Sequence, residues 1–87
     1  MNVLRADQRE VSIKFSRDWH DRFGGVQWCA GETGVPLLRD VLATFECEIV
    51  QLLVGGGDHL ICLGKVVHVN SKPGSPLIYV NRSYARK

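Results

Sequence analysis

The chain has 87 residues, enough for one small domain, and its 45% hydrophobic and 23% charged residues are typical of a soluble globular protein. Eleven Lys and Arg residues against nine Asp and Glu residues leave a net charge of +2, and their scattered positions argue against a nucleic-acid-binding protein. No apolar run approaches the ~20 residues of a membrane-spanning helix, and the charges from Arg5 onward argue against a signal peptide. The odd set of cysteines, without a CxxC pair, fits a cytoplasmic protein: Cys29, Cys47 and Cys62.

The first third of the chain has a helical pattern. Asp7 and Glu10 have the spacing of a capping box, with Asp7 as the N-cap. Apolar residues then recur every four positions, which is the spacing of one helix face: Val11, Phe15, Trp19 and Phe23. We therefore predict a helix over residues 7–15 whose aromatic stripe packs on a sheet.

The next segment, residues 24–40, contains repeated glycines and one proline, which favour turns and extended backbone. We predict an irregular segment there, anchored to the core by Trp28, Leu37 and Leu38. At the other end of the chain, Met1 to Leu4 has the pattern of a strand end with no preceding strand to pair with.

From Leu42 onward the pattern changes to strands. In residues 44–49 the apolar side chains occupy the odd positions and the polar ones the even positions, which predicts one face in solvent. The Gly55–Asp58 segment is a strong turn signal, so residues 42–54 and 60–69 are predicted to form an antiparallel hairpin. Residues 76–80 are predicted to add a strand to the same sheet, and 82–87 to form a basic tail.

Three strands and one helix provide a thin core for a chain of this length. The ordering cost of about 1.5 kcal/mol per residue is large for so few buried positions. The sequence therefore predicts part of a larger sheet, with open strand edges that associate with other copies or partners.

Several kinds of chemical site are disfavoured by the spacing of the reactive residues. The potential metal ligands lack the paired spacing of a zinc site, and Cys47 and Cys62 are expected to fill the core. Neither of these cysteines has an adjacent activating base, and no phosphate-binding GxxxxGK[ST] motif is present. The sequence thus predicts neither a metal centre nor a catalytic nucleophile.

The most distinctive local feature is Gly57-Asp58-His59 at the predicted hairpin tip, with Gly64 on the returning strand. Glycine lets a ligand approach the backbone, and histidine offers a ring and a donor near neutral pH. From the residues alone, these could equally be turn glycines beside an exposed histidine. The basic C-terminal segment, with Arg82 and Tyr84, could likewise contact an anion or be a solvated tail.

Taken together, these segments resemble the flavin reductase-like domain, the reductase component of two-component flavin monooxygenases. The resemblance follows the whole chain in order, and the Gly-Asp-His element and the terminal tyrosine-containing strand are its more specific parts. It rests on Asn2–Leu4 with Asp7-Gln8, Phe15-Ser16 with Asp21–Phe23, Trp28 with Gly31–Leu38, Ala43–Cys47, Gly57–His59, Gly64–Val67, and Pro76–Tyr79 through Tyr84.

The resemblance implies a mainly β protein with a short helix, namely a partial antiparallel split β-barrel of the FMN-binding type. It further implies binding of FMN or FAD, reduction of the flavin by NADH or NADPH, a homodimer, and release of reduced flavin to a partner monooxygenase. No acid or base is needed, because hydride passes between the two cofactors. The flavin and nicotinamide site would include Gly57, Asp58 and His59, with Arg82 and Tyr84 beside it.

The resemblance covers the C-terminal half of that domain, so residues 1–87 are expected to form one truncated domain without the loops that hold the flavin ring and phosphate. Two alternatives therefore stay open beside the reductase. One is an inactive partial barrel that acts only through oligomerisation or partner association. The other is a small basic barrel that binds nucleic acid, which is disfavoured because the strands lack an interleaved basic and aromatic face.

Overall fold

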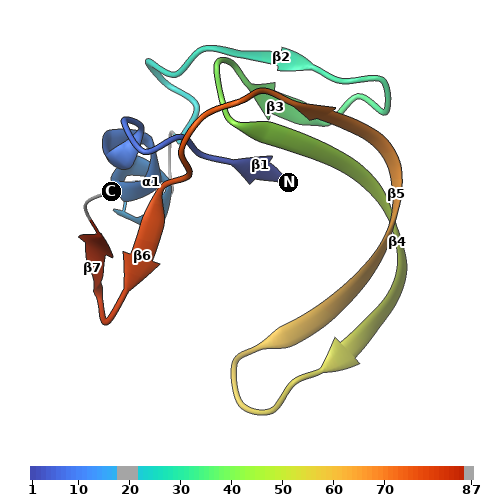
Figure 1. The fold of residues 1–87 in the computed structure, drawn as a ribbon. Coiled ribbons are helices and arrows are strands. Elements are labelled where there is room, and N and C mark those ends of the chain that lie inside the picture. The colour runs from blue at the N-terminus through green and yellow to red at the C-terminus, as the bar shows by residue number, and fades with distance from the viewer. Residues whose placement is uncertain (18–21, 86–87) are drawn as a thin grey trace.

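The computed structural model describes residues 1–17 and 22–85. The protein is mainly β with one short helix, as predicted, and all strand pairs are antiparallel (Figure 1). Within the described ranges, one sheet has the order β1-β4-β5, and two hairpins, β2-β3 and β6-β7, form small separate sheets. The elements are β1 (Asn2–Val3), α1 (Arg9–Arg17), β2 (Trp28–Ala30), β3 (Pro36–Leu38), β4 (Ala43–Val54), β5 (Leu60–Ser71), β6 (Ile78–Val80) and β7 (Ser83–Ala85).

The predicted long hairpin is confirmed, because β4 and β5 pair from Ala43 and Ser71 to Val54 and Leu60. Figure 1 shows that this ribbon is strongly curved, so that its tip and the tip of the β6–β7 hairpin lie toward the same side of the molecule. The N-terminal strand is also confirmed. Its partner lies later in the chain: Asn2 pairs with Thr44 on β4.

The third predicted strand does not belong to the β4–β5 sheet, and that prediction is wrong. The chain leaves β5 through a segment with Pro73 and Gly74, and then runs beside the segment after β1, where Arg5 pairs with Pro76. Asn81 and Arg82, both with positive φ, then reverse the chain, and β6 pairs with β7. The predicted basic tail is therefore a strand over Ser83–Ala85, while Arg86 and Lys87 lie outside the described residues.

The helix is confirmed, but its start is shifted and its predicted cap is wrong. Helix α1 begins at Arg9, and Gln8 takes the N-cap position because its carbonyl accepts the first helical bond from Ser12 N–H, at 3.3 Å. Asp7 instead pairs with Arg5, with Oδ1 3.2 Å from Nε. The backbone N–H of Arg5 donates a hydrogen bond to Gln8 Oε1, and this bond fixes the turn that precedes α1.

Phe23 lies between Phe15 on α1 and Trp28 in the segment that is predicted to be irregular. Phe15 meets Phe23 edge to face at 5.1 Å between ring centroids, and Phe23 lies 5.6 Å from Trp28. Trp28 is on β2, because residues 28–30 and 36–38 form a short hairpin and not an irregular loop. Trp19, His20, Asp18 and Asp21 lie outside the described residues.

The interior is small. Among the described residues only Val41 and Glu46 are buried, and the apolar residues of the long hairpin are largely exposed on both faces, with Ile49 at 67% and Val54 at 83%. All three cysteines are exposed as well, so the prediction that Cys47 and Cys62 fill a core is wrong for this chain. The reason is that none of the other described elements packs on the outer half of the β4–β5 ribbon.

The predicted wet face of β4 is also wrong at one position. Glu46 is at an even, polar position of the alternating segment, yet it is only 5% exposed. The turn between β2 and β3 packs over it, and this long-range contact is not visible in a local alternation. In the described ranges no helix is long and apolar enough to cross a membrane.

Candidate functional site

The tip of the β4–β5 hairpin is a tight turn that presents an Asp-His pair to solvent. Gly55 N–H donates to His59 O at 3.0 Å, and Gly56 and Gly57 have positive φ values of 85° and 62°, which favour glycine. His59 Nδ1 lies 2.8 Å from Asp58 Oδ1, while the two side chains are 82% and 94% exposed. In the neutral tautomer with the proton on Nδ1, Nδ1–H donates to the carboxylate and Nε2 is the acceptor of the ring.

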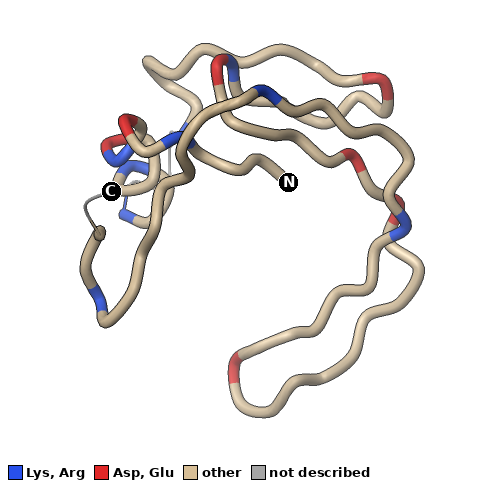
Figure 2. Tube along the Cα trace, in the orientation of Figure 1, with Lys and Arg blue, Asp and Glu red and all other residues tan. Residues whose placement is uncertain are grey.

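The hairpin tip has little side-chain bulk around this pair. A Cβ placed on Gly56 or Gly57 would have no atom within 4 Å. Figure 2 shows that the outer half of the hairpin is almost free of charge, and Asp58 is the one charged residue between positions 49 and 64. The arrangement can therefore stack an imidazole on a planar ligand, or hydrogen-bond to it, against an apolar surface.

The two site residues predicted near the C-terminus lie on the β6–β7 hairpin. Arg82 is exposed in its turn, with a φ of 61°. Tyr84 is half-buried against α1, with its hydroxyl 2.8 Å from Ser12 Oγ, the Arg9 guanidinium 5.1 Å from its ring centroid, and Tyr79 at 4.9 Å. The structure thus uses Tyr84 to attach β7 to the helix.

The structure does not bring the two predicted groups into contact. Across the described part of the chain, no hydrogen bond, ion pair or ring contact joins residues 57–59 to Arg82 or Tyr84. Both hairpin tips lie toward the same side of the molecule in Figure 1.

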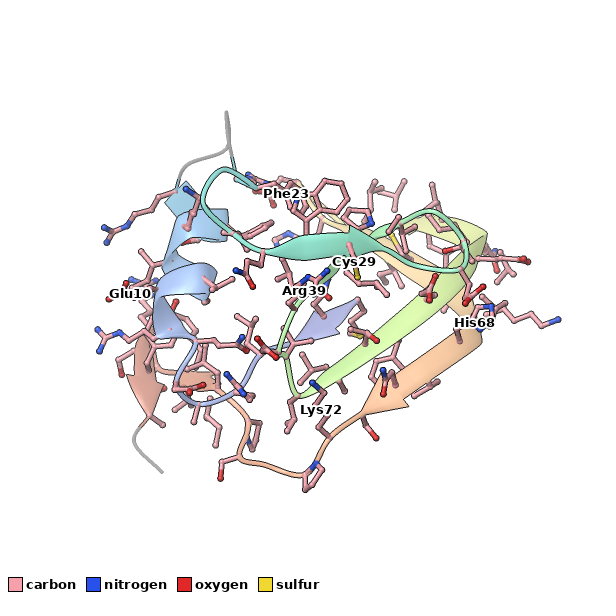
Figure 3. The ribbon with its side chains drawn as sticks, turned by 90° about the horizontal axis from the view of Figure 1, so that it is seen from above. Glu10, Phe23, Cys29, Arg39, His68 and Lys72 are labelled. Carbon is pink, nitrogen blue, oxygen red and sulfur yellow. The ribbon has the colours of Figure 1, made fainter. Side chains whose placement is uncertain are left out.

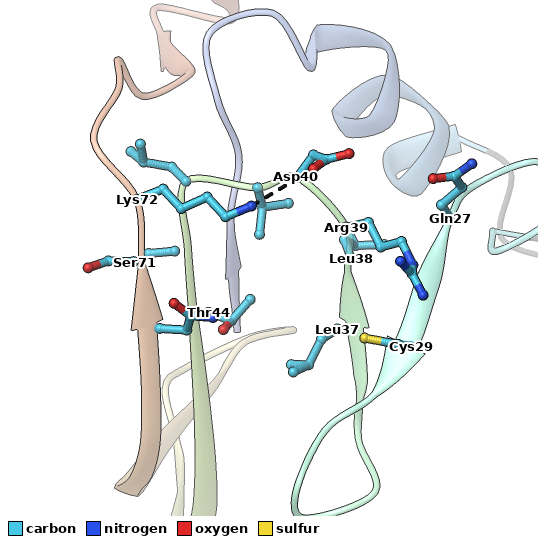
Figure 4. A pocket seen from close by; sticks show the side chains of 13 residues that line it. Gln27, Cys29, Leu37, Leu38, Arg39, Asp40, Thr44, Ser71 and Lys72 are labelled. Carbon is cyan, nitrogen blue, oxygen red and sulfur yellow. Dashed lines mark ion pairs between the residues drawn. The ribbon is translucent and has the colours of Figure 1, made fainter.

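Sequence reasoning missed a groove between the β2–β3 hairpin and the β4–β5 sheet. One end is a cavity of about 280 Å³ where Lys72 Nζ lies 3.9 Å from Asp40 Oδ1, with Arg39 and Cys29 on its wall (Figure 4). Figure 3 places His68 at the other end, away from Lys72, where a cavity of about 480 Å³ is lined also by Glu32 and Glu46. The two cavities share Leu37, Thr44 and Asn70.

The buried carboxylate of Glu46 organises this second cavity. Its Oε1 accepts hydrogen bonds from Thr33 N–H at 2.9 Å and Thr33 Oγ1 at 2.8 Å. The Thr33 N–H is the main reason that the pKa of Glu46 lies below its ordinary value, with Glu32 N–H and the charge of His68 adding to the effect and burial opposing it. Glu46 thus holds the β2–β3 turn as an anion bound by backbone amides.

The described residues contain no group of three or more His, Cys, Asp or Glu side chains that could hold a metal ion. Among the described residues no hydrogen bond joins Asp58 or His59 to a Ser, Thr or Cys side chain, and Oε1 of Glu46 already accepts two hydrogen bonds. The geometry therefore supports binding and orientation of ligands at the hairpin tip better than acid–base or nucleophilic catalysis.

Comparison with known proteins identifies the family. The flavin reductase like domain matches residues 1–87. The chain is 42% identical over 90 residues to a flavin reductase (NADH) of Kitasatospora aureofaciens, covering 99% of this chain and 47% of that protein. It is 31% identical over 87 residues to a reductase subunit of a flavin-dependent monooxygenase of Mycobacterium tuberculosis, covering 97% of this chain and 46% of that subunit.

A solved structure agrees with these relatives. The NADH:FAD oxidoreductase of Streptomyces globisporus C-1027, determined with NAD and FAD fragments, superposes with a TM-score of 0.89 and 33% identity, covering 99% of this chain and 53% of that one. The chain spans about half, or less, of the length of the curated relatives that it matches. Its fold is that of the split-barrel flavin reductases, and the chain belongs to the flavin reductase-like domain family, a family of oxidoreductases.

Proposed function

We propose that this chain takes part in the NAD(P)H-dependent reduction of FMN or FAD, and that Gly57, Asp58 and His59 contact the nicotinamide beside the flavin. The observation that supports the proposal most is the position of the Asp-His pair on an uncrowded glycine turn, in a chain of the flavin reductase-like family. Hydride transfer is supplied by the two cofactors, so the protein needs to bind and align them.

The described residues fit one wall of such a site. The imidazole of His59 is exposed and oriented by Asp58, and the neighbouring hairpin surface is apolar, which suits the face of a planar ring. Arg82 is exposed and can pair with a phosphate or other anion of the ligand. Tyr84 is proposed to contribute its ring, because its hydroxyl is bonded to Ser12.

We further propose that residues 1–87 form one half of the domain and that other strands complete it. Beyond the short pairing with β1, the edge of β4 has no partner strand in the described sheets, and neither has the outer edge of β5. Unpaired edges and apolar faces bind additional strands. A homodimer of completed domains is the assembly that we expect.

The acceptor of the reduced flavin is proposed to be a flavin-dependent monooxygenase. The support is that the Mycobacterium tuberculosis relative is itself a reductase subunit of such an enzyme. NADH is favoured over NADPH by the names of the Kitasatospora and Streptomyces relatives, while both FMN and FAD stay open for this chain. A cytoplasmic location stays a prediction from the cysteine content.

One observation favours a second function. The exposed apolar residues of the long hairpin, with Val54 at 83%, would support a chain that acts only by associating with itself or a partner barrel. A chain with this second function binds no flavin, so a measurement of flavin binding distinguishes the two functions.

The test is an assay of the purified chain with NADH or NADPH and with FMN or FAD. It is run alone and after mixing with the part of the Kitasatospora flavin reductase that the chain does not match. The proposal expects flavin binding and nicotinamide consumption in the mixture, with the unmatched part alone as control. Association without flavin binding would support the second function and reject the first.

A further inference from the structure

The long hairpin owes its curvature to two irregularities in the pairing of β4 and β5. Glu46 pairs with His68 but Cys47 with Val66, so Val67 is an extra residue on β5. A second shift, between Ile49 and Gln51, leaves an extra residue on β4. An extra residue on one strand bends and twists a ribbon. Both shifts lie on one short stretch, which is where Figure 1 shows the ribbon turning.

Gly64 lies between the two irregularities, opposite Ile49. A Cβ placed on Gly64 would lie 3.1 Å from Cys47 Cβ and 3.7 Å from Glu48 O. The two positions are diagonal neighbours, whose Cβ atoms are somewhat less than about 7–8 Å apart in a regular antiparallel pair. The strands approach this closely because position 64 has no side chain, and a glycine inside a strand marks such an approach.

We infer that Gly64 is a positioning residue: it permits the bend that aims the Asp58–His59 tip at the nicotinamide. The inference rests on the proposed function. His59 is five residues from Gly64, which is about 16 Å along a strand, so a change of about 10° in the bend moves the histidine by about 3 Å. A displacement of that size is enough to break a hydrogen bond or a stacking contact with the nicotinamide.

The regular pairing of β4 with β5 between the bend and the tip transmits a change in the bend angle to the tip. Leu52, Leu53 and Val54 pair in register with Cys62, Ile61 and Leu60, without a further shift before the turn. The Gly55–His59 hydrogen bond then closes the turn. The outer half of the hairpin therefore moves as a unit about the stretch that contains Gly64.

The experiment adds a side chain at position 64 and then removes the side chain of Cys47, which the added group would contact. Gly64→Ala places a methyl group against Cys47, and Gly64→Ala with Cys47→Gly removes the partner Cβ. The matched control is Gly64→Ala with Cys62→Gly, which makes the same cysteine change on the same hairpin away from the contact. Residual dipolar couplings of backbone N–H groups measure the angle between the inner and outer halves of the hairpin. Steady-state kinetics with NADH are measured in the completed mixture described above.

We expect Gly64→Ala to change the angle and to raise the KM for NADH about tenfold with a smaller change in kcat, because the tip contacts nicotinamide in ground and transition states alike. In the Gly64→Ala background, Cys47→Gly should restore both the angle and the KM for NADH, and Cys62→Gly should restore neither. If Gly64→Ala prevents folding, recovery by Cys47→Gly alone of folding together with the unsubstituted angle and KM for NADH supports the inference. Equal recovery by Cys62→Gly overturns it.

The inference and the proposed function fail in different ways. An angle that Gly64→Ala leaves unchanged overturns the inference, whatever the activity. A changed angle with an unchanged KM also overturns it, because the bend then has no effect on nicotinamide binding. Absence of reductase activity in the unsubstituted mixture rejects the proposed function instead.

Discussion

The hydroxyl of Tyr84 lies 2.8 Å from the hydroxyl of Ser12, and this hydrogen bond joins strand β7 to helix α1 across 72 positions of sequence. The ring of the same tyrosine contacts Arg9 and Tyr79. Because the β6–β7 hairpin is a separate sheet, these contacts and the pairing of Pro76 with Arg5 attach it to the rest of the chain. Tyr84 therefore has a structural role beside any role at a ligand.

The first prediction concerns this hydrogen bond. Tyr84→Phe removes the hydroxyl and keeps the ring, so the free energy of unfolding should fall by about 1 kcal/mol, the usual net value of one hydrogen bond. Ser12→Ala should cost a similar amount, and the double variant no more than about either alone. Urea unfolding followed by circular dichroism measures all three. Tyr79→Phe, which removes an exposed hydroxyl, is the control, and an equal loss there would contradict the assignment.

The second prediction concerns the pH dependence produced by Glu46. Its pKa is lower in the folded protein than the ordinary 4.5, mainly because Thr33 N–H binds the ionised form. The resulting stability is fully present above pH 4.5 and is lost as the pH falls through the lower, folded-state pKa. Glu46→Gln should therefore lower stability at neutral pH and flatten the loss of stability in acid. Thermal unfolding across the acid range measures this.

A matched control for Glu46→Gln exists on the same strand. Glu48 is exposed two positions away, so Glu48→Gln makes the same change without removing the bonds to the β2–β3 turn. It should leave the acid limb of the stability curve almost unaltered. Equal flattening by both substitutions would mean that net charge, and not the bond to Thr33, causes the pH dependence.

The third prediction concerns Gly31, which lies against the same carboxylate. A Cβ on Gly31 would lie 2.6 Å from the carboxyl carbon of Glu46, so Gly31→Ala must displace that side chain from its hydrogen bonds. A destabilisation of about 1–3 kcal/mol is expected, because the displaced carboxylate loses its hydrogen bonds to Thr33. In a Glu46→Ala background the same substitution should cost much less. Chemical unfolding of the four proteins gives the coupling, and additive losses would show that the contact does not matter.

The local features of this fold were predictable from sequence, and the long-range ones were not. The β4–β5 hairpin follows from alternation and a glycine turn, which are properties of adjacent residues. The partner of β6 depends instead on the path of the chain through Pro73 and Gly74 and on the two positive φ values at Asn81 and Arg82. A strand pattern fixes the local conformation and leaves the choice of partner open.

The candidate site divides in the same way. The Asp58–His59 pair was found because a glycine turn with a histidine is visible in a few adjacent letters. Glu46 was missed because alternation placed it on a wet face, and only the fold brings Thr33, thirteen positions away, over it. The signal that could have found it is the Gly31–Gly34 turn, whose backbone amides are suited to a carboxylate.

The fourth prediction concerns assembly. The exposed apolar residues of the hairpin predict that the chain forms dimers or larger species at about micromolar concentrations and above. Val54 is 83% exposed, so Val54→Lys should reduce association with little effect on folding. Sedimentation velocity over a concentration series measures this. A folded monomer at the highest concentration for the unsubstituted chain would contradict the prediction.

The fifth prediction concerns His59. If the ring positions the nicotinamide, His59→Ala in the completed mixture should raise the KM for NADH by about 5- to 30-fold, equivalent to about 1–2 kcal/mol for one stacked ring or charged hydrogen bond. The flavin should be less affected, because most of its contacts are expected elsewhere. Since the histidine transfers no proton in this proposal, kcat should change less than KM.

The control for this prediction is a substitution of Asp58, the hydrogen-bond partner of His59. Asp58→Asn keeps a hydrogen-bonding group 2.8 Å from Nδ1 but removes the charge, so it should raise the KM by less than His59→Ala does. Steady-state kinetics with free FMN and varied NADH separate the two ligands. Unchanged constants for both substrates would mean that His59 is an exposed turn residue. A loss of flavin affinity with a normal KM for NADH would mean that the ring contacts the flavin, because the same tip would then lie against the other cofactor.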